Sequence, residues 1–142
     1  MRMEELKESL EGYIYYEQAI ENIDLNIKEI EYEILGTPGI SGQEQTSKSN
    51  SFHSVTEDQA ITLITKKTAL QTLLKKKEIM ISKIDNALES LTDEEKNVIK
   101  LFYIEHRTWQ DISCRLNYSE RTCRYRRESA LKKMLGIINN KR

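Results

Sequence analysis

The stretch that decides the fold is TWQDISCRLNYSERTCRYRRESALKKMLG, residues 108–136. Thr108, with Asp111 three positions later, predicts the capped start of a short helix. The apolar side of that helix is expected to consist of Trp109, Ile112 and Leu116. Asn117 suits a turn after it, because Asn tolerates the left-handed backbone conformation. The stretch therefore begins as a short helix that ends in a tight turn.

A longer helix is predicted to follow, with Ser119 as its cap and a last turn near residue 135, before Gly136. At about 100° per residue, one face collects small and apolar side chains, which are Cys123, Ala130 and Met134. The opposite face, an arc of about 100°, collects Arg121, Arg124, Tyr125, Glu128 and Lys132. A short helix, a tight turn and a longer basic helix with two distinct faces predict a helix-turn-helix.

The basic face of the longer helix predicts contacts with DNA. The N-terminal half of the second helix of this motif enters the major groove, where Arg donates two bonds to guanine. Base contacts are therefore predicted for Arg121, Arg124 and Tyr125. Contacts with the DNA backbone are predicted for Arg107, Thr108, Arg115, Arg126, Arg127, Lys132 and Lys133. For each arginine alone, the alternative is an ordinary solvated surface charge.

The residues before this motif predict one more helix of the same domain. Thr92 and Glu95 have the spacing of a capping box. The apolar face of this helix is expected to consist of Val98, Ile99, Phe102 and Tyr103. We expect Trp109 to pack in the core, while Tyr118 suits either the core or a phosphate contact. Residues 90–142 are accordingly predicted to form a DNA-binding domain.

The charge of the chain is divided unevenly. Residues 1–104 hold 12 Lys/Arg and 19 Asp/Glu, a balance of −7, and residues 105–142 hold 10 and 4, a balance of +6. The sum is the net charge of −1. Such asymmetry favours a nucleic-acid partner for the basic end, the alternative being chance segregation of surface charge.

The N-terminal region, residues 1–89, predicts two long helices. The first covers residues 3–35 and carries an apolar seam at heptad spacing, formed by Tyr16, Ile20, Ile23, Ile27, Ile30 and Ile34. The second covers residues 57–89 and carries a matching seam, formed by Leu63, Leu70, Leu74, Ile81, Ile84 and Leu88. This spacing is typical of helices that pack as coiled coils.

The segment between these helices, residues 36–55, contains the sole proline and three of the five glycines, which predicts a flexible loop. Thr56 and Gln59 are expected to cap the second helix, with Val55 and Ala60 as a hydrophobic staple. An antiparallel hairpin of two helices buries only one seam per helix, so we expect it to pair with another copy or to dock on another protein, with a homodimer as the first expectation. The predicted fold class is all-α.

Other features of the sequence exclude whole classes of function. Cys114 and Cys123 fall at apolar positions of predicted helices, so both are expected to be small core side chains. With His53 and His106 they lack the spacing of a metal site. No cofactor is expected. No apolar run approaches about 18 residues and the N-terminus is too polar for a signal peptide, so a cytoplasmic protein without a membrane span is expected. An enzyme is not expected, because there is neither a Gly-rich phosphate loop nor a nucleophile–base pair.

Residues 91–135 resemble region four of bacterial sigma factors, which reads the −35 promoter element. The shared positions are Leu91, Glu95, Val98, Ile112, Leu116, Ser119, Ala130 and Leu131. The Tyr-x-x-x-x-Thr-Trp stretch at 103–109, Tyr118-Ser119 and the long helical region before them are more similar to the ArpU- and RinA-like late transcription regulators of phages and prophages. This resemblance implies base reading by Glu120, Arg121, Arg124 and Tyr125.

The chain also departs from the sigma pattern. His106 and Asn117 stand where the family often has glycine, and Arg126 stands where an aliphatic residue is usual. The sigma regions that bind the polymerase core and read the −10 element have no counterpart. The resemblance therefore implies an activator of late genes that acts at promoter DNA together with host RNA polymerase, rather than a complete sigma factor.

Two other functions fit the same sequence. One is a phage DNA-packaging oligomer similar to a small terminase subunit, which also combines a helix-turn-helix with helical oligomerisation. The other is a module that binds polymerase, since sigma region four contacts that enzyme as well as DNA. A ring assembly would favour the first, and binding that persists at high salt would favour the second.

Overall fold

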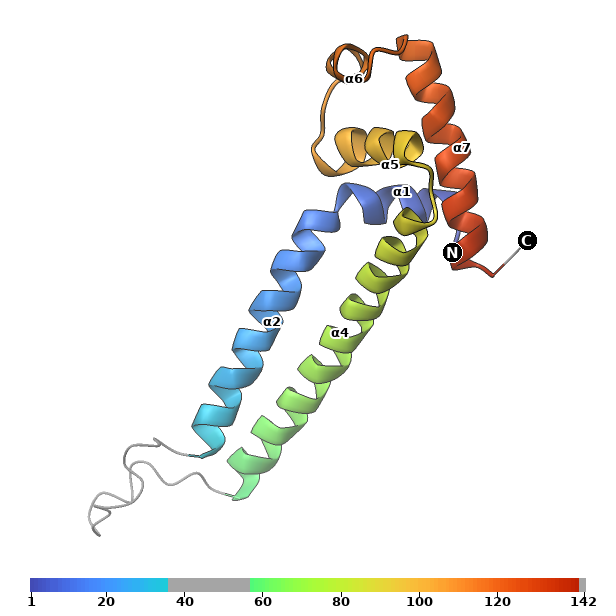
Figure 1. Ribbon diagram of the computed structural model, residues 1–142. Coiled ribbons are helices and arrows are strands. Elements are labelled where there is room, and N and C mark those ends of the chain that lie inside the picture. The colour runs from blue at the N-terminus through green and yellow to red at the C-terminus, as the bar shows by residue number, and fades with distance from the viewer. Residues whose placement is uncertain (36–56, 141–142) are drawn as a thin grey trace. The chain divides into compact units, whose positions relative to one another are not determined.

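The structure is a computed structural model that describes residues 1–35 and 57–140. Every regular element in these two ranges is a helix, and neither range contains a strand (Figure 1). The predicted all-α class is therefore confirmed. No described helix is both long enough and apolar enough to cross a bilayer. The predicted loop at 36–55, with Val55 and the cap at Thr56, lies outside the described residues.

The chain forms two compact units whose boundaries differ from the predicted division after residue 89. The first unit comprises Met1–Glu17 and Ile79–Arg142, and the second comprises Gln18–Glu78. The N-terminal residues join the C-terminal ones because Leu6 and Leu10 are fully buried in the core of the first unit. The domain that carries the basic helix is thus built from both ends of the chain.

The prediction of one unbroken helix over residues 3–35 is wrong. Helix α1 spans Met3–Glu11, helix α2 spans Tyr13–Ile34, and Gly12 lies between them with φ −92° and ψ 9°. Glycine is the ordinary residue least suited to a helix interior after proline, by about 1 kcal/mol relative to alanine. A change of direction is therefore least costly at Gly12, and it lets α1 reach the core of the first unit.

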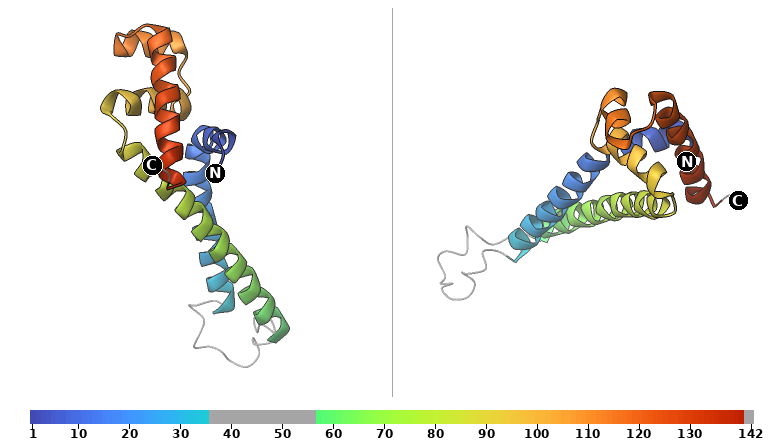
Figure 2. Two further views of the ribbon diagram at one scale, coloured as in Figure 1. Left: turned by 90° about the vertical axis from the view of Figure 1, so that its right-hand side faces the viewer. Right: turned by 45° about the horizontal axis from the view of Figure 1, so that its top comes forward.

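The core of the first unit joins α1 to the helices of the C-terminal region (Figure 1). These are the end of α4 (Glu57–Glu89), α5 (Asp93–Ile99), the π-helix η3 (Lys100–Ile104), α6 (Trp109–Leu116) and α7 (Glu120–Ile138). Helix α7 packs against α1, α5 and α6, and its run past α5 and α6 is visible from several sides (Figure 2). The buried members are Leu6, Leu10, Ile84, Ala87, Leu88, Leu91, Ile99, Tyr103, Ala130, Leu131 and Met134.

The start of α5 is set by local hydrogen bonds. Thr92 and Glu95 form the predicted capping box, in which the Thr92 side chain accepts from the Glu95 backbone. The helix then widens into η3, where the Glu105 amide donates to the Lys100 carbonyl at 2.9 Å. His106 follows with φ 53°, a left-handed conformation that ends the helix. The sequence offered no sign of this π-turn.

The end of α7 also differs from the prediction. Gly136 was expected to terminate the helix, yet α7 continues to Ile138. Ile137 and Ile138 pack against the core, and burial of two large side chains outweighs the cost of one helical glycine. Asn139 follows, and its side chain accepts from the Met1 ammonium and donates to the Met1 carbonyl, both at 2.9 Å.

The second unit contains most of α2 and the first two-thirds of α4. On α2, Ile23, Ile27 and Ile30 are buried, while most residues between them are exposed. On α4, the heptad positions are partly buried, and they include Leu63, Lys67, Leu70 and Leu74. The residues between these heptad positions are exposed. The Lys67 ammonium pairs with the Glu31 carboxylate of α2 at 2.9 Å.

Truncation of Leu10 tests the place of α1 in the first unit. Leu10→Ala should lower the free energy of unfolding by about 2–5 kcal/mol, because it opens a cavity in that core. The measurement is urea unfolding followed by the fluorescence of Trp109, the sole tryptophan, which lies in the first unit. Leu25→Ala is the control, because Leu25 is 50% exposed. An equally small effect of both substitutions would contradict the assignment of α1.

Candidate nucleic-acid interface

The turn between α6 and α7 is held by short-range contacts. Asn117 adopts φ 60° and ψ 36°, the left-handed conformation favoured by its residue type. Ser113 on α6 donates a hydrogen bond to the Tyr118 carbonyl. The Ser119 hydroxyl then accepts from the Thr122 amide at 3.1 Å and caps α7. These contacts fix where α7 begins and therefore which of its side chains face outward.

Helix α7 has two distinct faces. Its inward face consists of fully buried side chains, which are Cys123, Ala130, Leu131 and Met134. Its outward face near the N-terminus carries Glu120, Arg121, Arg124 and Tyr125, all exposed. Tyr125 is the extreme case, at 74% exposure. Four residues predicted to read bases thus lie together on one accessible face.

Arg124 lies over Trp109, one ring of a stacked aromatic pair. The rings of Phe102 and Trp109 are stacked, with centroids 4.2 Å apart. The Arg124 guanidinium lies 5.4 Å from the Trp109 ring, and the Arg127 guanidinium lies 5.0 Å from it. Arg124 also pairs with Glu120 at 3.6 Å. Trp109, expected in the core, is partly buried in this stack and limits the orientations open to Arg124.

Arg126 and Arg127, which were predicted to contact the DNA backbone, make contacts within the first unit instead of extending into solvent. Arg126 pairs with Glu94 at 2.6 Å and lies over the Tyr118 ring at 4.9 Å. The Tyr118 hydroxyl donates to the same Glu94 at 3.1 Å, so Tyr118 serves this cluster. The side chains of Arg126 and Arg127 are only 30% and 23% exposed, and the Nε atom of each is buried without a partner.

Glu95 is a second buried anchor for α7. It is 4% exposed, and it accepts hydrogen bonds from Ser129 and from the Lys133 ammonium, each at 3.0 Å. Burial raises the pKa of the Glu95 carboxyl. The hydrogen bonds from Lys133, Ser129 and Thr92 together lower it by more than burial raises it, so the pKa of Glu95 lies below the ordinary 4.5. Lys133, predicted to contact DNA, therefore already has a buried partner.

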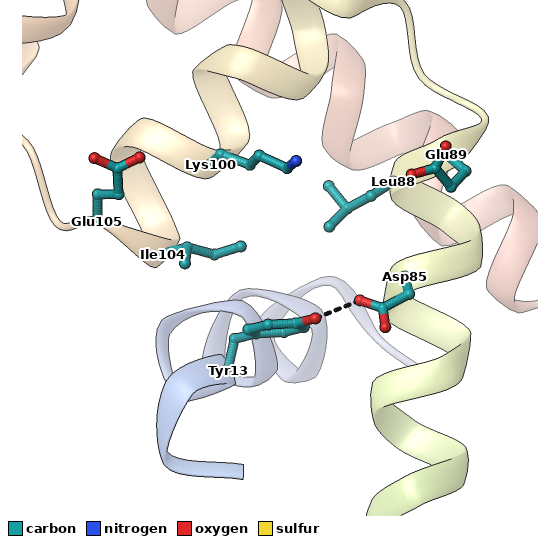
Figure 3. Close-up of a pocket in the computed structure, with 7 residues that line it drawn as sticks. All are labelled: Tyr13, Asp85, Leu88, Glu89, Lys100, Ile104 and Glu105. Carbon is teal, nitrogen blue, oxygen red and sulfur yellow. Dashed lines mark hydrogen bonds between the residues drawn. The ribbon is translucent and has the colours of Figure 1, made fainter. Parts of the chain in front are cut away.

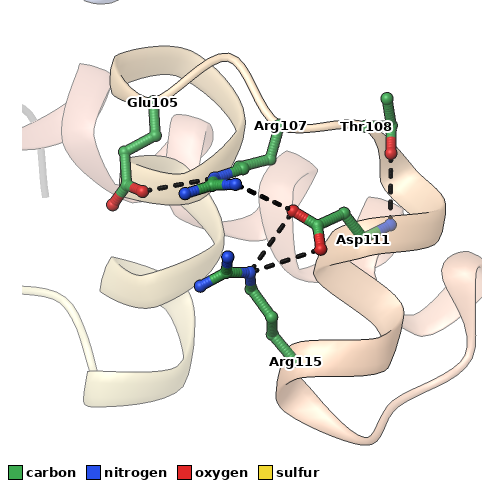
Figure 4. Close-up of polar contacts among 5 residues, drawn as sticks. All are labelled: Glu105, Arg107, Thr108, Asp111 and Arg115. Carbon is green, nitrogen blue, oxygen red and sulfur yellow. Dashed lines mark hydrogen bonds and ion pairs between the residues drawn. The ribbon is translucent and has the colours of Figure 1, made fainter.

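Three further predicted DNA-backbone contacts, Arg107, Thr108 and Arg115, surround Asp111 (Figure 4). Arg107 pairs with Asp111 at 3.4 Å and Arg115 pairs with it at 3.3 Å. Arg107 also pairs with Glu105 at 3.4 Å. The Thr108 hydroxyl accepts from the Asp111 amide at 3.2 Å and caps α6. Across the described residues, Arg121 and Lys132 are the predicted DNA-contacting cations that are exposed and form no ion pair.

The two cysteines have different environments. Cys123 is buried as predicted, and burial raises the pKa of its thiol. Cys114 is exposed, so its predicted place in the core is wrong. On the short helix α6, Ile112 occupies the inward position, and Cys114 two residues later points away from it. In the described ranges, no cluster of His, Cys, Asp and Glu is arranged to hold a metal ion.

A separate pocket lies beside η3 in the first unit (Figure 3). Its lining consists of Tyr13, Asp85, Leu88, Glu89, Lys100, Ile104 and Glu105. The Tyr13 hydroxyl donates to the Asp85 carboxylate, and burial together with this bond raises the pKa of Tyr13. Acidic side chains outnumber the one lysine here, so the pocket is unsuited to a nucleic-acid backbone.

A family model described as "Protein of unknown function (DUF722)" matches residues 6–136, and the chain therefore belongs to that family. The matched region begins within α1 and ends within α7, and it includes the residues between these helices. No curated protein and no solved structure was found to match the chain.

Neutralising Glu95 tests its role as an anchor. Glu95→Gln keeps a residue suited to the capping box but removes the charge that pairs with Lys133, so it should cost about 1–2 kcal/mol of stability at neutral pH. Because the folded-state pKa of Glu95 is lowered, this stabilisation is complete above the unfolded pKa and is lost as pH falls through the folded pKa.

The difference in unfolding free energy between wild type and Glu95→Gln should accordingly be largest near neutral pH and shrink below the ordinary 4.5. Urea titrations at several pH values, followed by Trp109 fluorescence, measure it. Glu4→Gln is the control, because Glu4 is an exposed acidic residue in the first turn of α1. A difference independent of pH would show that the charge of Glu95 contributes nothing.

Proposed function

We propose that this chain, as a member of the DUF722 family, is a sequence-specific DNA-binding transcription regulator. In this proposal α6, the turn at Asn117 and α7 act as a helix-turn-helix, and α7 enters the major groove. The resemblance to sigma region four and to late regulators of phages supports a role as a late-gene activator that acts with host RNA polymerase.

The observation that carries the proposal is the two-sided character of α7. Its inward face is fully buried, so the helix cannot rotate to expose another surface. Its outward face presents Arg121, Arg124 and Tyr125 in the N-terminal half, where this motif contacts bases. Arg can donate two bonds to guanine, and Glu120 can accept one from cytosine.

The ion pairs of the unit divide the predicted DNA-backbone contacts into two groups. Arg126, Arg127 and Lys133 are held by contacts within the unit, and they position α7 in this proposal. Lys132 is exposed, and Arg107 and Arg115 lie at the surface beside α6. These last three are better placed to reach phosphates, and binding should weaken as salt rises because such contacts release counterions.

The second unit is proposed to be an antiparallel hairpin of α2 and α4 that forms an oligomer. Its support is the heptad pattern of burial on both helices and the pair between Glu31 and Lys67. Seam side chains of α4 within this unit, such as Leu63, Leu70 and Leu74, are only partly buried. A second copy that covers them would remove more apolar surface from water.

Selection of bound fragments tests base reading by α7. The full chain is incubated with fragments of a bacterial host genome that carries a prophage, and the bound fragments are sequenced. Wild type should enrich a discrete sequence, while Arg121→Ala and Arg124→Ala should each lose preference at one base pair, a cost of about 1–3 kcal/mol. Lys66→Ala, an exposed substitution on α4, is the control.

The proposal fails if wild type enriches no sequence, or if the two α7 variants enrich the same sequence as strongly as wild type does. Binding that resists high salt and has no sequence preference would instead favour the polymerase-binding module.

Light scattering of the full chain tests the oligomer. The wild-type mass should be that of a dimer, and Leu63→Asn or Leu70→Asn should shift it toward the monomer, because each places a polar side chain in the seam. Leu25→Asn is the control on an exposed position. A ring-sized mass would favour the DNA-packaging alternative, and a monomeric wild type would contradict the oligomer.

A further inference from the structure

We propose that the Asp111 carboxylate occupies, in the free protein, the place that a DNA phosphate takes in the complex. This inference rests on the proposed function, because it concerns how the same surface is regulated. Asp111 then acts as an internal competitor of DNA: it lowers the affinity of the protein for every duplex, whatever its sequence.

The geometry around Asp111 carries the inference (Figure 4). The Nη1 atom of Arg107 donates to Oδ2 of Asp111 at 3.4 Å, and the Nε atom of Arg115 reaches both Oδ1 and Oδ2 at 3.3 Å. One carboxylate therefore engages two guanidinium groups, which approach it from the segment before α6 and from the last turn of that helix. Both arginines are among the predicted contacts of the DNA backbone.

Carboxylate and phosphate are interchangeable partners for this arrangement. Arginine binds either anion through parallel, charge-assisted hydrogen bonds. The side chains of Arg107, Asp111 and Arg115 are 39%, 37% and 48% exposed, so water and a ligand can reach the pairs. Ion pairs at this exposure are individually weak, so a phosphate can replace the carboxylate. By contrast, Glu95 is buried, and its bond with Lys133 is sheltered from such exchange.

The position of Asp111 restricts what else its side chain does. The cap of α6 is made by the Thr108 hydroxyl and the Asp111 backbone amide, not by the Asp111 carboxylate. Removal of the charge should therefore leave the cap intact and lose only the modest attraction between a carboxylate and the first turn of a helix. The principal consequence is that Arg115 loses its ion pair and Arg107 keeps only its pair with Glu105 at 3.4 Å.

Phosphate contacts position a protein on DNA without distinguishing sequences. Because DNA must first displace the Asp111 carboxylate, competition by Asp111 should reduce the affinity for specific and random duplexes by the same factor. The base preference stays with the outward face of α7. Asp111 thus limits how much of the protein is held on DNA that lacks its target sequence.

The test compares Asp111→Asn with wild type by fluorescence anisotropy, with the full chain and a labelled duplex of random sequence. Asp111→Asn should bind about three- to thirtyfold tighter, which corresponds to the loss of two exposed ion pairs. The plot of log affinity against log salt should also steepen by about 1–2, because up to two more phosphates are engaged.

Asp93→Asn is the matched control. Asp93 is an exposed acidic residue in the first turn of the short helix α5, and its substitution removes the same charge from the same unit. It should change affinity less than about twofold. The double variant Arg107→Ala/Asp111→Asn should lose part of the gain, because the two residues are coupled. The urea midpoint followed by Trp109 fluorescence verifies that each variant is folded.

The inference is overturned if Asp111→Asn binds no tighter than Asp93→Asn, or if its gain persists in full when both Arg107 and Arg115 are replaced by alanine. Either result leaves the proposed function intact provided that wild type binds DNA. If neither wild type nor any folded variant binds duplex DNA at low salt, the proposed function fails and this inference fails with it.

Discussion

The structure depends above all on the burial of one face of α7. Cys123, Ala130, Leu131 and Met134 are each fully buried, and together they contact helices from both ends of the chain. Removal of this much apolar surface from water fixes the rotation of α7 about its own axis. The arginines of the opposite face owe their common orientation to that rotation, since nothing in their own chemistry would gather them.

Acidic side chains then determine what each basic residue of the first unit can do. Glu94 and Glu95, in the first turn of α5, hold Arg126 and Lys133 of α7. Both glutamates are also favourably placed for the positive end of the α5 dipole. The cations of α7 thus differ in role even though they are neighbours in sequence. Some position the helix, while others face the solvent.

Features that depend on neighbouring residues could be predicted from the sequence. The caps at Thr92, Thr108 and Ser119 involve residues three positions apart, and the left-handed Asn117 follows from its residue type. The same holds for the buried stripe of α7, which follows from helical periodicity alone. These features supplied the all-α class and the outward face of the candidate interface.

Features that depend on distant residues could not be predicted. The pair between Arg126 and Glu94 and the packing of α1 against α7 join segments far apart in the sequence. The first helix breaks at Gly12, but one glycine does not say where the segment before it packs. Cys114 lies two residues after the buried Ile112, and therefore on the opposite side of α6, so its residue type was a poor guide to its burial.

The second unit is an insertion in the sequence of the first, because the first unit comprises Met1–Glu17 and Ile79–Arg142. During synthesis, Leu6 and Leu10 leave the ribosome long before Leu131 and Met134, and their core cannot close until α7 is complete. The entropic cost of closing a loop grows only slowly with its length. The insertion therefore slows formation of this core more than it lowers the stability of the folded protein. The length of the inserted helices can therefore vary during evolution while the outward face of α7 stays the same.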